Sequence, residues 1–249
     1  MAEKNSGIIA CSRYSYPPNS LSLCGPINAV ANLKYYSNGG VTDLGTREIL
    51  SEFSTLYPYL SLIAYENKLS DPFDIRVVEA YWLGNKLLNI PKISFVRHLT
   101  DSIGLKKKLT RGKLNFILDK FKFDLLPHHS FHVLNIYKRT GHLDIPYTVK
   151  TMDACLVNWG RVVEILPDKL KIRTQRLKLL NDRLIWEENI ERKIIPQGEK
   201  DKIFKKVIIG DLVSYHWGML CQKLSTRQLN NIKYFTHLSL SAANHQFRL

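Results

Sequence analysis

The chain has 249 residues, of which 45% are hydrophobic and 23% are charged, and its formal net charge is +14. This composition is typical of a globular protein and excludes an intrinsically disordered chain. The sequence contains no apolar run of about 18 residues, which a membrane-spanning helix needs, and its first residues lack the apolar core of a signal peptide. We therefore expect a cytoplasmic protein with no membrane partner.

The positive charge is concentrated in three clusters, at residues 106–113, 169–178 and 200–206. None of them matches an RNP, KH or zinc-finger pattern. Charge without a motif bears on association and solubility. An acidic protein partner therefore accounts for it as well as RNA does, and a solvated lysine-rich surface is the simplest account. We expect a protein partner rather than a nucleic acid.

The first part of the chain has the apolar spacing of helices. Asp71 and Pro72 offer an N-cap aspartate followed by proline at the first helical position, and Pro58 is expected to kink or break a long helix. The expected helices cover residues 27–36, 46–67, 95–105, 110–121 and 128–138, with one more starting at Asp71.

The pattern changes near residue 142, after which short runs of alternating apolar residues predict strands. These runs lie at residues 154–157, 160–165, 170–174, 177–180, 184–187, 191–195 and 212–216. Strands of this length and spacing suggest a small barrel. The tail over residues 225–244 predicts a helix that Ser225 caps. We thus predict an α+β fold, with a helical domain over residues 1–145 and a β-barrel domain with a C-terminal helix over residues 146–249.

Two motifs in the second domain carry candidate metal ligands. Residues 155–165 read CLVNWGRVVEI, so that the thiol of Cys155 precedes an extended apolar run. Residues 210–216 read GDLVSYH, so that a second strand ends on the imidazole of His216. A soft thiolate and a borderline imidazole at strand ends of one barrel can together hold a metal fragment.

These motifs resemble the signature of the HypC/HupF family of [NiFe]-hydrogenase maturation chaperones, over residues 152–225. In that family the first run has the form C-L-x-x-P-G-x-V-x-E-I, and a G-D-x-V-x-x-H strand is followed by a short helical tail, here residues 217–224. The resemblance implies an OB-like β-barrel that carries an iron fragment bearing cyanide and carbon monoxide. It also implies a maturation partner or the hydrogenase large subunit as the protein that is contacted.

By this resemblance, Cys155 is the iron-binding thiolate and His216 is its companion. A thiolate suits low-spin iron(II), and neutral imidazole is a suitable second donor. The family's cysteine follows the initiator methionine, whereas Cys155 is internal, and Trp159 stands where the family has proline. The resemblance favours a non-catalytic metal carrier or accessory protein. A relative that has lost metal handling and kept the docking surface is the alternative.

A histidine cluster, Pro127-His128-His129-Ser130-Phe131-His132, offers a second possible metal site. On a helix, His128 and His132 share a face and can supply two imidazoles to Zn²⁺ or Fe²⁺. The glutamate of a zincin motif is missing. Candidates for a third ligand are Asp74, Glu79 and His98. Alternatively, His128 and His129 occupy an N-terminal turn and His132 packs in the core.

Cys24 is a candidate nucleophile, since it precedes Gly25-Pro26 and a predicted helix whose N-terminus lowers the pKa of a thiol. With His129 or a neighbouring histidine, Cys24 could serve a Cys–His hydrolase or transferase. A packed cysteine is the simpler alternative. The four cysteines form no CxxC pair, so we expect free thiols. An enzyme with its site in the helical domain is therefore the alternative to the metal-carrier hypothesis.

Overall fold

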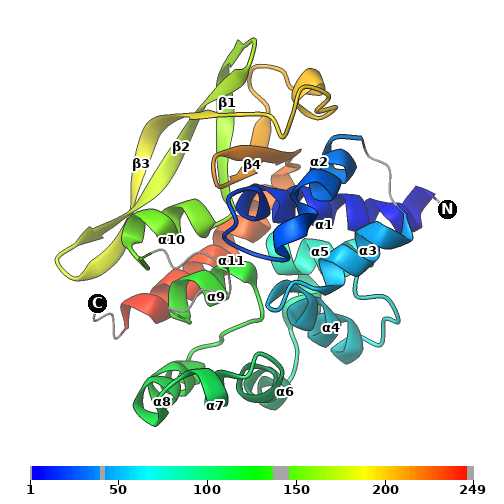
Figure 1. The fold of residues 1–249 in the computed structure, drawn as a ribbon. Helices are drawn as coiled ribbons and strands as arrows, with labels where there is room; N and C mark the ends of the chain where they lie inside the picture. The colour runs from blue at the N-terminus through cyan, green and yellow to red at the C-terminus, as the bar shows by residue number, and fades with distance from the viewer. Residues whose placement is uncertain (1, 40–42, 137–145, 246–249) are drawn as a thin grey trace.

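A central helix that the sequence pattern did not predict organises the fold. In the computed structural model, which describes residues 2–39, 43–136 and 146–245, α1 (Ala2–Ser20) contacts both the other helices and the sheet (Figure 1). Every residue from 11 to 19 is buried. A helix that is buried on all sides has no polar face and therefore no amphipathic period to detect.

The helices that follow are α2 (Val30–Gly39), α3 (Leu44–Ser51), α4 (Leu56–Glu66), α5 (Ile75–Trp82), α6 (Lys92–Arg97), α7 (Leu105–Lys108), α8 (Arg111–Asp119), α9 (His129–Asn135) and α10 (Val149–Cys155). Of these, α2, α3 and α5 pack against α1. In Figure 1, α4 and α6–α8 lie below, the sheet lies above, and α1 and α11 (Thr226–Asn244) lie between them. The predicted cap of α11 is confirmed, because the side chain of Ser225 accepts a hydrogen bond from Gln228 N.

Two helix boundaries differ from the predictions. The helix expected over residues 46–67 is two helices, and the break lies before Thr55, whereas Pro58 lies in the first turn of α4, where the missing N–H costs no intrahelical bond. Asp74, not Asp71, caps α5 by accepting a hydrogen bond from Arg76 N. Asp71 instead forms an ion pair with Arg47 across to α3.

The predicted α+β class is confirmed, but the sheet does not close into a barrel. Its five strands run antiparallel in the order β3-β2-β1-β4-β5. The strands are β1 (Asn158–Leu166), β2 (Lys169–Leu180), β3 (Arg183–Ile194), β4 (Leu212–His216) and β5 (Met219–Lys223). Within the described residues, the edges β3 and β5 meet at a single bridge between Ile195 and Met219. Closure fails because β5 has 5 residues and β3 has 12, so most of β3 has no partner on that side.

Two local predictions around this sheet were wrong. Cys155 ends the helix α10 rather than starting a strand, and β1 begins only at Asn158. The stretch expected as a helical tail contains β5, because Trp217 and Gly218 both adopt positive φ and form a tight turn that returns the chain along β4.

The hydrophobic core of the described residues is divided into three clusters, of which the largest joins the helices and the sheet. The largest buried cluster includes Tyr14 of α1, Phe131 of α9 and Ile232 of α11, together with Trp159 of β1 and Cys221 of β5. The expected domain boundary at residue 145 lies outside the described residues, and the division stays a prediction. Among the helices of the described ranges, none is long and apolar enough to cross a membrane.

A buried ion pair ties α1 to the segment after β3. Arg13 Nη2 lies 3.0 Å from Asp201 Oδ2, and the two side chains are 4% and 1% exposed. Arg13 also donates to the carbonyl oxygens of Ser37 and Leu220, and Asp201 accepts from Ile203 N. This network holds the N-terminal helix against the sheet.

Candidate metal centre

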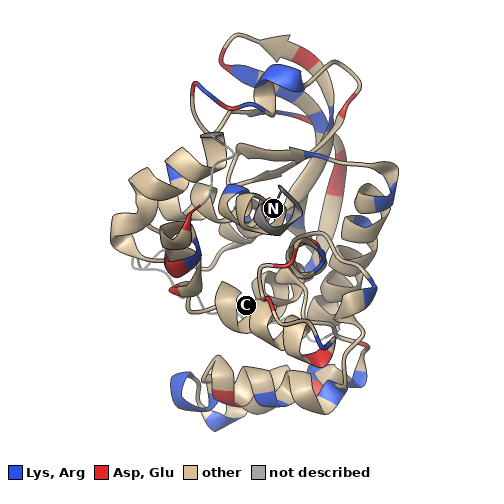
Figure 2. Cartoon of the chain, turned by 90° about the vertical axis from the view of Figure 1, so that its right-hand side faces the viewer, with Lys and Arg blue, Asp and Glu red and all other residues tan. Residues whose placement is uncertain are grey.

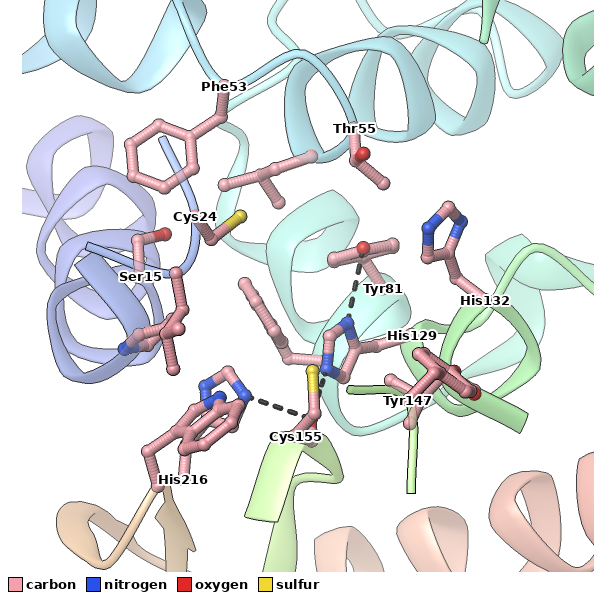
Figure 3. A pocket seen from close by; sticks show the side chains of 16 residues that line it. Ser15, Cys24, Phe53, Thr55, Tyr81, His129, His132, Tyr147, Cys155 and His216 are labelled. Carbon is pink, nitrogen blue, oxygen red and sulfur yellow. Dashed lines mark hydrogen bonds between the residues drawn. The ribbon is translucent and has the colours of Figure 1, made fainter. Parts of the chain in front are cut away.

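A pocket opens where α1, α5, α9, the end of α10 and the end of β4 meet. The cavity has a volume of about 70 Å³, and its wall includes Cys24, Phe53, Tyr81, His129, Cys155 and His216 (Figure 3). Gly25 adopts a φ of +79°, and a side chain there would collide with the ring of Phe53. The glycine therefore lets this ring close one side of the pocket against the turn that carries Cys24.

Cys155 and His216 come together because α10 ends beside the end of β4. A capping box between Thr148 and Thr151 starts α10, and Cys155 is its last residue, half-buried, with its side chain directed into the pocket (Figure 3). His216 is the last residue of β4 and is buried. The next N–H, that of Trp217, donates to the carbonyl of Ala154 at 3.0 Å, which fixes the two chain segments together.

His129 joins them from the helical part of the chain. It is the first residue of α9, and its Nδ1 lies 3.2 Å from the Tyr81 hydroxyl. Its Nε2 lies 2.8 Å from the carbonyl oxygen of Cys155. The rings of His129 and His216 meet edge to face at 5.3 Å between centroids. The two imidazoles thus flank the backbone of Cys155 from two different elements.

The donor atoms of His129, Cys155 and His216 all lie within 4.8 Å of one another. Three donors of one tetrahedral ion, at about 2.1 Å for nitrogen and about 2.3 Å for sulfur, lie about 3.4–3.6 Å from one another. Side-chain adjustments of about 1 Å therefore bring these donors to one ion. Two imidazoles and a thiolate form a set that suits zinc, iron(II) or copper.

The hydrogen bonds of His216 are incomplete in the neutral protein. Its Nδ1 lies 2.8 Å from Tyr14 O, and its Nε2 lies 2.9 Å from Cys155 O. Both oxygens only accept, and a neutral imidazole has a single N–H, so one of these contacts lacks a hydrogen. A metal ion at Nε2, with the hydrogen of Nδ1 donated to Tyr14 O, resolves the conflict. Metal-bound histidines usually donate their other N–H in this manner.

Protonation does not resolve the conflict near neutral pH. Burial lowers the pKa of His216 to about 4, and the hydrogen bonds to the carbonyls of Tyr14 and Cys155 offset this only in part. Burial also lowers the pKa of His129 well below its usual value, and the nearby His216 lowers it further. Both rings are therefore neutral at pH 7, which is the form that binds metals.

Aromatic rings seal the back of the centre. The ring of Trp82 lies 4.6 Å from that of His129 and 5.7 Å from that of His216, and it stacks on Tyr14 at 5.2 Å. Tyr81 packs edge to face against Trp82 at 4.8 Å. An apolar surround of this kind lowers the local dielectric and strengthens the binding of a cation to an anionic thiolate.

The structure separates the histidine pair that was expected to share a helix face. His128 is the N-cap of α9, its Nδ1 lies 2.7 Å from Ser130 Oγ, and its ring stacks on Phe235 of α11. His132 lines the pocket, and its Nδ1 lies 3.3 Å from the Tyr59 hydroxyl. The two side chains point to different places because α9 begins one residue after His128. The side chain of His128 therefore does not lie on the helical face that His132 occupies.

The other candidates are divided between the pocket and the surface. Cys24 lines the same pocket as His129, so the structure does bring this predicted pair into one cavity. His98 is buried against Tyr59, at 4.7 Å between ring centroids. Asp74 pairs with Arg76 on the surface, and Glu79 pairs with Arg227 of α11. None of the four cysteines, all of which lie in the described ranges, forms a disulfide.

One contact of the centre has no detectable sequence signal. Tyr81, which orients His129, lies in α5 among several other aromatic residues, and no motif distinguishes it. His129 itself was expected only as the partner of Cys24.

Comparison with known proteins adds a family but no described activity. Neither the curated proteins nor the solved structures include a match to this chain. A family model does match, over residues 3–249, and its description is a family of unknown function. Because the match covers almost the whole chain, this protein belongs to the DUF6390 family.

Proposed function

We propose that this protein is a cytoplasmic accessory protein of [NiFe]-hydrogenase maturation, which carries or docks an iron fragment at His129, Cys155 and His216. One observation carries the proposal. The thiol and the imidazole of the two HypC/HupF-like motifs lie together at one pocket, with a third donor from α9, all within 4.8 Å. Such a donor set fits an iron(II) fragment better than a bare structural ion, because it leaves a coordination position for other ligands.

Each residue has a definite task in this proposal. Cys155 supplies the anionic sulfur, and its half-buried position leaves the pocket accessible to the cargo. His216, held at Nδ1 by Tyr14 O, presents Nε2 to the same point. Tyr81 holds His129 in the same way. The bound fragment would supply the iron and its diatomic ligands, and the protein would supply the donors, their orientation and a dry surround.

The basic surface suits an acidic protein partner. Figure 2 shows lysine and arginine at the upper end, near the sheet and the loop before β4, and along the lowest helices, α6–α8. The loop before β4 carries Lys205 and Lys206 beside Ile208 and Ile209, which are 64% and 65% exposed. Positive charge of this kind steers association with an acidic surface such as that of a hydrogenase precursor or a maturation protein.

The test uses protein that is isolated anaerobically from its own cells. Iron analysis and infrared spectroscopy should detect about one iron per chain with bands of metal-bound cyanide and carbon monoxide. Cys155→Ser should remove both, since it removes the anionic donor. Cys24→Ser is the matched control, because it changes a second thiol of the same pocket that lies outside the donor set.

A parallel titration separates metal binding from cargo identity. Cobalt(II) added to purified apoprotein should give sulfur-to-cobalt charge-transfer absorption with a stoichiometry of about one. Cys155→Ser and His216→Gln should each weaken binding by more than about 100-fold, beyond the roughly 10–100-fold range typical of outer-shell changes. If wild-type protein binds no cobalt, or if Cys155→Ser binds it equally well, the metal centre does not exist.

A Cys–His enzyme is the second candidate, because Cys24 shares the pocket with His129 and His132. A nucleophilic thiol needs a nearby base and an open face. In this case iodoacetamide near neutral pH should label Cys24 quickly, and His129→Gln should slow the labelling. Labelling at the rate of an ordinary exposed thiol would remove this candidate.

A further inference from the structure

Ser15 of α1 carries a buried hydroxyl whose hydrogen bonds are incomplete. It is 1% exposed and lines the pocket of the metal centre, and apart from the neighbouring thiol of Cys11 its Oγ has no partner among the described residues. Figure 3 shows its oxygen turned toward the side of the pocket where Cys24 lies, on the wall that faces His129 and Cys155. A buried hydroxyl that lacks a full partner costs free energy, which a bound ligand can recover.

The neighbouring Ser12 shows that this is not the ordinary behaviour of serine in α1. Ser12 is also buried, and its Oγ donates to Ile8 O, four residues earlier, at 2.9 Å. This is the usual way for a helical serine to satisfy its hydroxyl. The side-chain neighbour of Ser15 is the thiol of Cys11, and burial raises the pKa of this thiol to about 12, so Cys11 stays neutral and is a weak hydrogen-bond partner. The Ser15 hydroxyl is therefore available to a group that enters the pocket.

The size of the pocket limits what that group can be. Its volume of about 70 Å³ exceeds by roughly five times the 10–15 Å³ that one water needs, so it accepts only a few non-hydrogen atoms. Three protein donors leave at least one coordination position for an outside ligand. Ser15 belongs to the wall of the same pocket, so a ligand in this position can direct its other end towards that hydroxyl.

We propose that the pocket holds a compact Lewis base of about two or three non-hydrogen atoms on the metal, and that Ser15 Oγ donates a hydrogen bond to its distal atom. This inference rests on the proposed function, because the ligand binds the metal of that site. It goes further in assigning a ligand subsite to the N-terminal helix, which the two sequence motifs do not include.

The experiment uses the full chain loaded with cobalt(II) and titrated with azide, which has three atoms and a negative charge. Azide should change the visible absorption of the cobalt, and its dissociation constant follows from the titration. Ser15→Ala should weaken azide binding by about 10- to 100-fold, the range for a hydrogen bond to a charged group, while the affinity for cobalt stays within about threefold. Ser12→Ala is the matched control and should leave both affinities unchanged, because its hydroxyl is satisfied within the helix.

The outcomes separate this inference from the proposed function. Cobalt binding with no azide response, or with equal azide affinity in wild type and Ser15→Ala, overturns the subsite and leaves the metal centre intact. Failure of wild-type protein to bind cobalt removes both. A melting curve for each variant, followed by circular dichroism, confirms that the cobalt-loaded protein is folded at the temperature of the titration.

Discussion

The buried ion pair between Arg13 and Asp201 gives the sharpest test of how the N-terminal helix is held. Asp201→Asn keeps the shape of the side chain but removes its charge, which leaves the guanidinium buried without a counter-ion. Loss of one partner of a buried pair costs about 3–5 kcal/mol. Arg13 keeps its contacts to the carbonyl oxygens of Ser37 and Leu220, so we expect the lower value, about 3 kcal/mol.

Urea unfolding measures this cost as a shift of the midpoint. With a slope of about 3 kcal/mol per molar, a loss of about 3 kcal/mol lowers the midpoint by about 1 M at unchanged slope. The control is Asp101→Asn, whose pair with Lys106 is about 60% exposed on both sides and should change stability by at most about 1 kcal/mol. A midpoint for Asp201→Asn as close to wild type as that of the control would refute the reasoning. The double variant Arg13→Met/Asp201→Asn should lose less than the sum of the two single losses, since no charge is then left unpaired.

Three further predictions test the centre and its frame. Tyr81→Phe removes the hydroxyl that contacts His129 and should weaken cobalt binding by about 10-fold. The control is Tyr59→Phe, which removes a hydroxyl that contacts His132, outside the donor set, and should change cobalt binding by less than about twofold. Gly84→Ala should lower the free energy of unfolding by about 3 kcal/mol, because φ is +88° and the new carbon would lie 1.9 Å from the ring of Phe235 in α11. Gly112→Ala in α8 is the control: the new carbon meets nothing within 4 Å, and the free energy of unfolding should rise by up to about 1 kcal/mol. Burial lowers the pKa of His98 to about 4, so the unfolded state takes up its proton first and stability falls as the pH drops from about 6.5 towards 4. Between pH 7 and 5 this residue should account for about 2 kcal/mol of the loss, and urea titrations of His98→Phe should lack that part; an equal loss in wild type and variant would contradict the assignment.

The elements that the sequence predicts well are those with local determinants. The helix α11 is marked by a serine cap with glutamine at the third helical position, and both hydrogen bonds of this capping box form. The strand β4 coincides with its predicted residues, because Gly210 adopts a φ of +94° and sets its start. Both features depend on residues within a few positions of one another, so a sequence pattern is sufficient to find them.

The elements that the sequence misses depend on packing. The helix α1 contains Pro17 and Pro18 and is surrounded by protein along its second half, so neither propensity nor amphipathic period marks it. Its role rests on contacts with segments far along the chain, such as the hydrogen bond between Tyr14 and Ser214 hydroxyls. The sequence predicts β2 and β3 as two short strands each, because a register shift near Gln175 interrupts the alternation of apolar and polar residues.

The candidate site was predictable in its residues but not in its grouping. Cys155 and His216 were expected as one set, and His129 was expected in another, with Cys24. What unites them is the packing of α9 beside the end of α10, which places the ring of His129 against the carbonyl of Cys155. No periodicity within either segment encodes that contact, because it is a property of the tertiary fold.

The packing of these elements also explains how a cysteine in the middle of the chain can serve this site. A cysteine at a chain terminus is oriented by few contacts, whereas Cys155 is fixed by α10 and by the hydrogen bond of Trp217 N to Ala154 O. His129 reaches it from α9, which packs against α11 and α10. The three donors therefore belong to three separate elements, α9, α10 and β4, and metal binding would stabilise the docking of these elements by mass action. The helical part of the chain is thus a component of the site, because α9 supplies the third donor and the helices α1 and α5 supply the aromatic wall beside it.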